Sequence, residues 1–371
     1  MFLLWSLLFV ACGPQCDEPG TSCIALGTGA HGFAGEELDQ PVPAREARLY
    51  YPMDVTAWPD EPEDFVLVDW NNERVRLVQD GEIRTIIGTN FPGDGDVAMG
   101  DRHDPGARGT LVALNHPVSA EFAPDGRLYL AAWHNHKVRR WDPTDDRVRV
   151  TVANHDQTTG NNGGYSGDGG LAEEAHISFP SSIAFDAGGN YYIVDQQNLV
   201  IRRVDTAGII DTFAGSGELG DADGDALSAS FYFSEGPTNF QPPPAGAIEI
   251  DRVTGTIYLA DTFNGLIRTL SVDGGAVSTL PIDGLVTPTD VELGPDGRLY
   301  IADPGAHQVF AADVNTGALT VIAGTGSPGW GEDGLPALET ELNAPNGIDI
   351  ASDGSLLIAD TLNSVIRRVT P

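Results

Sequence analysis

The segment YYIVDQQNLVIRRV at Tyr191–Val204 decides the fold, because the chain contains six versions of it. The common pattern is an aliphatic strand with a carboxylate at its end, a short polar turn, and a second strand that opens with an aliphatic residue and arginine; the second version has Ala132 in place of the carboxylate and the fifth has no arginine. The other five are VLVDWNNERVRLV at Val66–Val78, LYLAAWHNHKVRRW at Leu128–Trp141, IYLADTFNGLIRTL at Ile257–Leu270, LYIADPGAHQVFAA at Leu299–Ala312 and LLIADTLNSVIRRV at Leu356–Val369. A period of about 58 residues is the scale of a propeller blade with long connections. We therefore predict an all-β fold, a six-bladed β-propeller.

The two ends of the sequence complement each other. A further strand follows five of the units, whereas the sixth stops at Pro371 without one. The segment SCIALGTG at Ser22–Gly29 matches LTVIAGTG at Leu319–Gly326, which is the further strand of the fifth unit. An open sheet edge invites aggregation, and closure removes it. The sequence therefore predicts one propeller over residues 21–371, closed by an N-terminal strand that completes the last blade.

Composition excludes one class of partner. The net charge is −34, and Lys137 is the single lysine among the 20 basic residues. Such a surface repels phosphates, so we expect no nucleic acid partner and no binding to anionic lipid headgroups. With 41% hydrophobic residues, the chain has enough apolar side chains to form a core. We expect the protein to be a monomer.

The N-terminus predicts export. Residues 1–11 are almost wholly apolar and too short to span a bilayer, which is typical of a signal peptide. The stretch LFVAC resembles a bacterial lipobox, which implies a lipid on Cys12 and a tether over residues 12–20. An ordinary signal peptide of a secreted protein is the alternative. Cys16 and Cys23 then form an even pair, for which we expect a disulfide in an oxidising compartment. The predicted location is extracytoplasmic, on the cell envelope, with the membrane reached only through the lipid.

The repeated units resemble NHL repeats. The stretch Gly164–Gly217 carries the family's features in order: a Gly-Asp-Gly connection, a proline opening the inner strand, an Asp-x-x-Asn turn, an aliphatic–Arg pair and a closing Ala-Gly. The resemblance covers residues 21–371 and implies a propeller, of a bacterial secreted or lipoprotein type. It is weak for function, because NHL propellers include protein-binding, RNA-binding, sensor and amidating-lyase members, and fold alone does not give function.

Residues that recur in nearly every unit are expected to be structural. We predict that the repeated arginines bridge to carboxylates of the same or the next blade; they are Arg76, Arg139, Arg202, Arg268 and Arg367. Two acidic loops, Gly93–Asp96 and Gly220–Asp225, also suit calcium. Both fall where the Gly-Asp-Gly connection belongs, so the alternative is a Gly-rich loop between blades.

The candidate site lies on the face formed by the inter-blade connections and the turns between second and third strands, which we call the top face. Histidines gather there around the second unit, whose turn lacks the usual carboxylate and has Ala132 instead. Imidazoles suit transition metals, so the candidate metal ligands, for zinc above all, are His116, His134 and His136. The candidate ligand-binding residues on this face are Asp54, Asp69, His116, His134, His136 and Asp290. The two inner-strand aspartates give the central funnel a negative potential.

One connection is unusually short. Only IDGLVT separates Pro281 from Pro288 between the fourth and fifth units, which leaves a notch in the rim. The neighbouring loop Ser230–Gly246 carries Phe231, Tyr232, Phe233 and Phe240. These aromatics are either a partner-binding patch or the small core of their own loop.

These observations favour a non-enzymatic extracytoplasmic propeller that binds a protein, peptide or glycan through its top face. The competing hypothesis is a metal-dependent lyase or hydrolase that uses the top-face histidines of the second blade. The sequence contains no Gly-x-Ser-x-Gly elbow, His-Glu-x-x-His or Cys-x-x-Cys pair, so no catalytic residue is predicted. No motif demands a cofactor, and calcium and zinc are the two metals left open.

Overall fold

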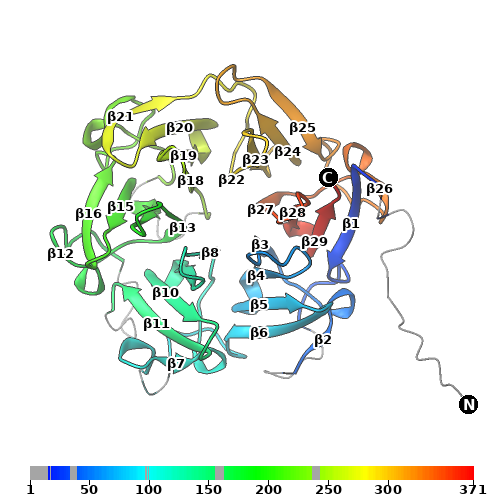
Figure 1. The fold of residues 1–371 in the computed structure, drawn as a ribbon, viewed down its shortest axis with the longest axis horizontal. Helices are drawn as coiled ribbons and strands as arrows, with labels where there is room; N and C mark the ends of the chain where they lie inside the picture. Colours follow the sequence, from blue (N-terminus) through cyan, green and yellow to red (C-terminus); the bar gives the residue numbers. More distant parts are fainter. Residues whose placement is uncertain are drawn as a thin grey trace, which may run out of the picture.

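The chain folds into a closed ring of six β-sheets, which Figure 1 shows face-on. The computed structural model describes residues 16, 18–33, 40–96, 98, 100–154, 163–235 and 243–371. Each sheet is antiparallel, with its first strand at the ring centre and later strands farther out, so the predicted six-bladed propeller is confirmed. Within these ranges no helix has the length and apolar character needed to cross a bilayer.

The blades are numbered along the chain. Blade 1 contains β3 (Pro52–Ala57), β4 (Phe65–Asp69), β5 (Arg74–Gln79) and β6 (Glu82–Gly88). Blade 2 contains β8 (Ser119–Phe122), β9 (Leu128–Ala132), β10 (Lys137–Asp142) and β11 (Arg147–Val152). Blade 3 contains β13 (Pro180–Phe185), β14 (Tyr191–Asp195), β15 (Val200–Val204) and β16 (Ile209–Ala214). Blade 4 contains β18 (Ala247–Asp251), β19 (Thr256–Asp261), β20 (Leu266–Ser271) and β21 (Gly274–Thr279). Blade 5 contains β22 (Asp290–Leu293), β23 (Leu299–Asp303), β24 (Gln308–Ala312) and β25 (Leu319–Ala323). Blade 6 contains β27 (Pro345–Ile350), β28 (Leu356–Asp360), β29 (Val365–Val369) and β1 (Thr21–Leu26).

Short elements complete the blades. A two-residue strand pairs with the outer strand of every blade except blade 5; these strands are β2 (Val42–Pro43), β7 (Ala107–Arg108), β12 (Gly170–Leu171), β17 (Gly224–Asp225) and β26 (Leu335–Pro336). Each comes from the long connection that precedes its blade, and the connection into blade 5 is short. A 3₁₀ turn links the second and third strands in the other five blades: η2 (Trp70–Asn72), η5 (Trp133–Asn135), η7 (Gln196–Asn198), η9 (Thr262–Asn264) and η11 (Thr361–Asn363).

The ring closes as predicted from the sequence. β1 pairs antiparallel with β29, with Ser22 opposite Val369 and Cys23 opposite Arg368. The same strand pairs on its other side with β26, so the N-terminal strand lies inside blade 6 rather than at an edge. Every blade therefore has its four main strands, and the last one contains both ends of the described propeller.

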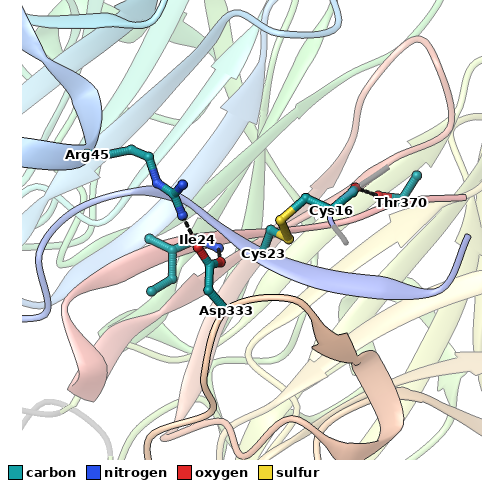
Figure 2. Close-up of a disulfide and its surroundings, with 6 residues drawn as sticks. All are labelled: Cys16, Cys23, Ile24, Arg45, Asp333 and Thr370. Carbon is teal, nitrogen blue, oxygen red and sulfur yellow. Dashed lines mark hydrogen bonds and ion pairs between the residues drawn. A yellow bond between two sulfur atoms is a disulfide. The ribbon is translucent and has the colours of Figure 1, made fainter. Parts of the chain in front are cut away.

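A disulfide holds the closing strand at its start. Cys16 and Cys23 are bonded across a separation of 7 residues, and Figure 2 shows the bond beside β29. The Thr370 hydroxyl donates to the Cys16 carbonyl at 2.9 Å. Farther along β1, Asp333 accepts the Ile24 backbone N–H at 2.6 Å and pairs with Arg45. These contacts join the N-terminal segment to two blades. Cys12 and the predicted signal peptide lie outside the described residues.

The core is divided among the interfaces between neighbouring blades. In the interface of blades 1 and 2, Val75 and Leu77 pack in one cluster with Leu130 and Trp141, all at most 2% exposed. Equivalent clusters join each other pair of neighbours around the ring. Fully burying one such side chain contributes about 1.5–3 kcal/mol, so each blade is stabilised chiefly by the two beside it.

Candidate functional site on the top face

The carboxylate that ends each second strand has a structural role. The five residues concerned are fully buried: Asp69, Asp195, Asp261, Asp303 and Asp360. Asp69 accepts the Tyr50 backbone N–H at 2.8 Å and the Asn72 amide at 2.8 Å. Because the Asp69 side chain is 0% exposed, the prediction that it contacts a ligand is wrong. The carboxylate instead fixes the loop above the inner strand.

The predicted arginine bridges are confirmed. Arg76 pairs with Asp69 at 2.9 Å, and Arg367 pairs with Asp360 at 2.7 Å, with every side chain fully buried. Arg202 lies 3.5 Å from Asp195. Burial raises the pKa of Asp195 to about 7, although the arginine favours the charged form. These pairs order the repeat, and removing one partner leaves a buried charge without compensation.

The two acidic loops considered for calcium are occupied by the protein's own cations. Asp223 of the Gly220–Asp225 loop pairs with Arg268 at 2.8 Å and accepts the Thr279 hydroxyl at 3.0 Å. Asp94 of the Gly93–Asp96 loop pairs with both Arg139, at 2.7 Å, and Lys137. These ion pairs favour the alternative, a structural loop between blades, over calcium at Asp94 and Asp223.

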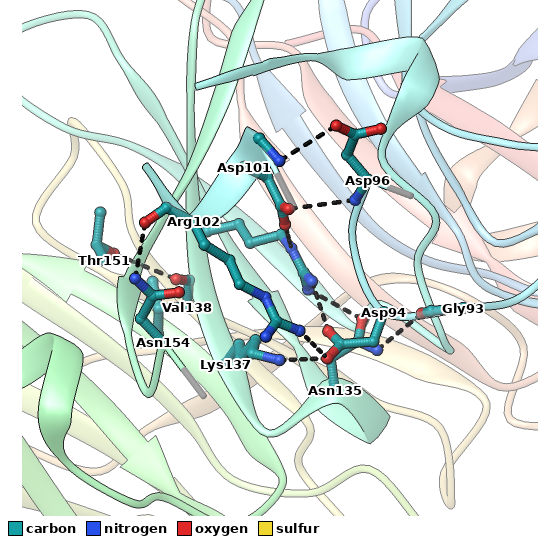
Figure 3. A network of polar contacts seen from close by, with 12 residues as sticks. Gly93, Asp94, Asp96, Asp101, Arg102, Asn135, Lys137, Val138, Thr151 and Asn154 are labelled. Carbon is teal, nitrogen blue, oxygen red and sulfur yellow. Dashed lines mark hydrogen bonds and ion pairs between the residues drawn. The ribbon is translucent and has the colours of Figure 1, made fainter. Parts of the chain in front are cut away.

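Blade 2 rebuilds its turn without the usual carboxylate, and Figure 3 shows the polar contacts of Asp94, Asn135 and Lys137 in this region. Asn135 replaces the acceptor lost at Ala132, and its side-chain oxygen accepts from Arg139 at 3.0 Å. Asp94 then supplies the negative charge for Arg139 and for the fully buried Lys137. Burial lowers the pKa of Lys137 to about 8, with the neighbouring arginine acting in the same direction. The missing aspartate is thus compensated structurally and does not mark an empty ligand position.

The His136 side chain forms a hydrogen bond between neighbouring blades and is not part of a metal site. It follows η5 with a left-handed backbone, φ 51°, and its Nδ1 accepts the Phe179 backbone N–H of the next blade at 3.0 Å. His307 does the same for Ala344 at 3.1 Å. Glu73, at the equivalent position in blade 1, accepts the His116 backbone N–H. His136 is only 2% exposed, so its assignment as a metal or ligand contact is wrong.

The other two predicted histidines meet. His116 Nδ1 lies 2.9 Å from His134 Nδ1, and 2.8 Å from the Asn115 side-chain oxygen. The Glu73 carboxylate, a residue the sequence did not single out, comes within 3.6 Å of His116 Nδ1. Burial lowers the pKa of His116, and burial together with His116 lowers the pKa of His134 to about 4. Both imidazoles are therefore neutral at pH 7, the form that binds metals or accepts hydrogen bonds.

Aromatic side chains extend this histidine pair along the top face of blades 1 to 3. Ring centroids follow one another at 4.8 Å from Trp70 to His116, 4.7 Å to His134, 4.3 Å to Trp133 and 4.8 Å to Phe179. Trp70, His116 and His134 are half-buried, whereas Trp133 and Phe179 are buried beneath them. We call the three half-buried residues the aromatic patch. Offset and edge-to-face ring contacts of this kind stabilise a preformed surface.

The opposite half of the ring carries small residues at the same positions. In blade 4 these are Gly246, before the inner strand, and Thr262, at the start of η9; in blade 6 they are Ala344 and Thr361. At these positions the face is therefore asymmetric, with large rings in blades 1 and 2 and short side chains in blades 4 and 6. Rings also occur elsewhere on the top face, since Tyr232 packs on Phe263 of η9 and Trp330, before blade 6, is 45% exposed.

The central channel below this face is acidic and narrow. Asp54 accepts the Val55 and Ala120 backbone N–H groups at 2.9 and 2.8 Å, and Asp290 accepts those of Val291 and Ile348 at 3.0 and 2.8 Å. Burial raises the pKa of Asp54 to about 7, and raises that of Asp290 well above its usual range with help from Asp54. The predicted pair thus lines the channel and also joins neighbouring inner strands.

The channel contains four further carboxylates that the sequence reasoning missed: Glu121, Glu249, Glu292 and Asp349. Each sits within an inner strand between apolar residues, and that pattern is the signal that was available. The free space near the top is about 30 Å³, and in the middle about 20 Å³, which is too small for an organic ligand. The lower end widens to about 360 Å³.

The aromatic loop before blade 4 contributes Phe231 and Phe233 to the core between blades 3 and 4, where they pack with Val194 and Leu259, so the alternative of a separate loop core is wrong for these two. Phe231 and Phe233 are both 0% exposed, and their rings stack with centroids 5.1 Å apart. Tyr232 packs on Phe263. The alternative of a partner-binding patch at Phe231 and Phe233 is therefore excluded; Phe240 lies outside the described residues.

Known proteins with related sequences share the repeat. A family model described as the Teneurin NHL domain matches residues 139–235. NHL repeat-containing protein 2 of Homo sapiens is 24% identical over 362 residues, which cover 86% of this chain and 46% of that protein. Protein SUPPRESSOR OF QUENCHING 1, chloroplastic, of Arabidopsis thaliana is 24% identical over 276 residues, 70% of this chain and 25% of that protein. The chain thus spans less than half the length of these relatives.

Solved structures share the fold. A protein of unknown function from Bacteroides thetaiotaomicron aligns with a TM-score of 0.64 at 15% identity, over 94% of this chain and 75% of its own. An auxiliary nutrient binding protein from Bacteroides ovatus aligns with a TM-score of 0.59 at 12% identity, over 95% of this chain and 76% of its own. A gluconolactonase from Xanthomonas campestris gives 0.55 at 11% identity, over 86% of each chain. Likeness at this level of identity concerns the fold alone. The repeat, the six-bladed ring and the sequence matches together identify the chain as an NHL-repeat β-propeller.

Proposed function

We propose that this propeller is a non-catalytic binding protein that holds a protein, peptide or glycan segment across its top face. The observation that carries the proposal is the aromatic patch of Trp70, His116 and His134, which is half-buried, preformed and spans blades 1 and 2. Exposed aromatic rings give large contact area at small entropic cost, and they are enriched where proteins bind peptides and sugars.

The narrow channel supports a ligand that lies on the face rather than one that enters from it. The free space beneath the mouth is about 30 Å³, less than a small organic molecule needs. The carboxylates of Asp54 and Asp290 below the mouth favour ligand groups that are cationic or that donate hydrogen bonds. A nutrient-binding protein is among the proteins with this fold, which is compatible with such a role but does not assign it.

We further propose that the protein works outside the cytoplasm, tethered by a lipid on Cys12, with secretion as the alternative. The Cys16–Cys23 disulfide supports this location, because such bonds persist in oxidising compartments. Acylation of Cys12 would leave the remaining two cysteines paired with each other.

The test is a binding measurement against partners recovered from envelope extract and against a glycan array. Trp70→Ala and His134→Ala should each weaken binding about tenfold or more, since each removes part of the contact area. Asp125→Ala, in the first hairpin of blade 2 on the opposite face, is the matched control and should bind normally. If Asp125→Ala alone lost binding and the top-face variants bound normally, the site would lie on the face opposite the aromatic patch and the proposal would be wrong.

The histidine pair favours a second candidate, a metal-dependent lyase or hydrolase. The two Nδ1 atoms lie 2.9 Å apart with the Asn115 oxygen and the Glu73 carboxylate beside them, so a zinc ion could take two imidazoles and an oxygen ligand after small side-chain movements. Metal analysis of the purified protein decides between the candidates. Stoichiometric zinc that is lost in His134→Ala and kept in His103→Ala would favour the enzyme. A metal-free, fully folded protein that binds its partner would favour the binding role.

A further inference from the structure

The lower end of the central channel is a built cavity on the face opposite the aromatic patch. It is open to solvent and has about 360 Å³ of free space between the ends of the inner strands. Ligand sites of proteins typically have about 300–1,000 Å³. The upper channel, with about 20 Å³ in its middle, isolates this cavity from the top face. The space therefore has the size of a small organic ligand, and any ligand reaches it from below.

The walls combine apolar surface with carboxylates. The accessible apolar part consists of Ala57, Pro59 and Leu293, and the acidic part consists of Glu121, Glu249, Glu292 and Asp349. Arg252 is the one basic residue in the lining, and it pairs with Glu121 at 3.0 Å. Three carboxylates in the cavity wall are thus left without a cationic partner among the described residues. Asp251, also in the lining, is held by the Thr254 hydroxyl at its own hairpin.

The three carboxylates differ in how they are satisfied. Asp349 accepts the Ala57 and Ile350 backbone N–H groups at 2.7 and 2.6 Å. Glu249 is likewise hydrogen-bonded by backbone N–H groups. Glu292 accepts no hydrogen bond from the described residues, and burial and the surrounding carboxylates raise its pKa well above the usual range. The cavity therefore presents acceptors that the protein itself does not satisfy.

We propose that this lower cavity binds a small organic cation, a primary amine or diamine with a short hydrocarbon chain. The ammonium group lies among Glu249, Glu292 and Asp349, and the hydrocarbon chain packs against Ala57, Pro59 and Leu293. The charge of the ammonium replaces the protons that the crowded carboxylates otherwise retain. Binding therefore releases protons, and affinity increases as the pH rises from 5.5 to 8. This role is independent of the top-face function.

The experiment is calorimetric titration of the intact protein with 1,4-diaminobutane, with 1,4-butanediol as the neutral probe of the same length. We expect diamine binding that is about tenfold tighter at pH 8 than at pH 5.5 and that is lost in Glu292→Gln. Glu174→Gln, an exposed carboxylate on the outer rim, is the matched control and should bind as the wild type does. Trp70→Ala should also leave this binding intact, which separates the cavity from the top face.

Three outcomes would overturn the proposal. Equal binding of the diol would show that charge plays no part. An equal loss of diamine binding in Glu174→Gln would show that the amine is attracted by the overall negative charge of the protein and not by the cavity. Displacement of the diamine by micromolar calcium, with calcium binding tighter than any amine, would assign the cavity to a metal ion instead. Melting temperatures of each variant, measured without ligand at pH 5.5, verify that the variants are folded.

Discussion

The carboxylates of the central channel should make this protein more stable in mild acid than in mild base. Burial raises the pKa of Asp54 and of Glu249 to about 7 and that of Asp349 to about 6. A folded-state pKa above the unfolded value means that the folded protein binds protons more tightly. The resulting stabilisation is fully present below about pH 4, the pKa of unfolded carboxylates, and is lost as the pH rises through 6 to 7.

The magnitude follows from Asp54, which is 9% exposed. A pKa increase from 3.8 to about 7 corresponds to on the order of 4 kcal/mol for one group. The channel carboxylates interact, so we expect the set to contribute an effect of this order rather than a sum. For a chain of 371 residues, about 4 kcal/mol corresponds to roughly 5 °C in melting temperature over the whole range from about pH 4 to 8. Between pH 6 and 8 a group with a folded pKa of about 7 loses about 1.4 kcal/mol of this stabilisation, or roughly 2 °C. His116 and His134 act in the opposite direction below about pH 6.5, because their folded pKa values are lowered.

Differential scanning calorimetry from pH 6 to 8, in amine-free buffer, measures the effect, and Glu292→Gln isolates it. This variant removes one channel charge without removing a hydrogen bond to a described residue, so it should melt higher than the wild type at pH 8 and equally at pH 5.5. Glu174→Gln should follow the wild type throughout. A wild-type melting temperature that is constant or rises from pH 6 to 8, with Glu292→Gln parallel to it, would refute the reasoning.

Four further predictions concern the framework and the N-terminus. Deleting Met1–Gly29 removes β1 from blade 6, and should cause aggregation or a large fall in melting temperature; a stable monomer would contradict the closure. Reducing the Cys16–Cys23 bond should lower the free energy of unfolding by about 2–3 kcal/mol, measured by urea titration with and without reductant. Intact-mass analysis of protein from its native envelope should find acyl groups on Cys12, and an unmodified Cys12 in an intact N-terminus would remove the export hypothesis. Arg202→Ala leaves Asp195 buried without its cation and should cost about 3–5 kcal/mol, whereas Arg203→Ala on the same strand should cost much less.

Much of the fold was predictable because the same pattern of strands and turns occurs six times in the sequence. In the third unit, Asp195 marks the end of the second strand and Arg202 lies in the third strand, and the equivalent residues mark the same boundaries in most other units. The incomplete sixth unit indicated that β1 closes the ring. The contact between His116 and His134 was harder to predict from the sequence, because it joins two separate loops. The position of the His116 loop depends on the hydrogen bond from the His116 backbone N–H to the Glu73 carboxylate.

The errors have one physical cause. Sequence position places a residue on a face but does not say which way its side chain points. Asp69 and His136 do lie at the top of the blades, yet both turn inward, where backbone N–H groups of the neighbouring loop need acceptors. The acid-lined channel was missed for a related reason: Glu249 and Asp349 come from blades distant in sequence, and only the closed ring brings them together.

The most direct test of the account is a hydrogen-exchange footprint of the bound top-face partner. We predict slower exchange in the turns Trp70–Asn72 and Trp133–Asn135, which carry Trp70 and His134 of the aromatic patch, and unchanged exchange in the hairpins Pro124–Gly126 and Ser352–Gly354. Protection confined to those hairpins, with the two turns exchanging as in the free protein, would contradict a binding site on the top face.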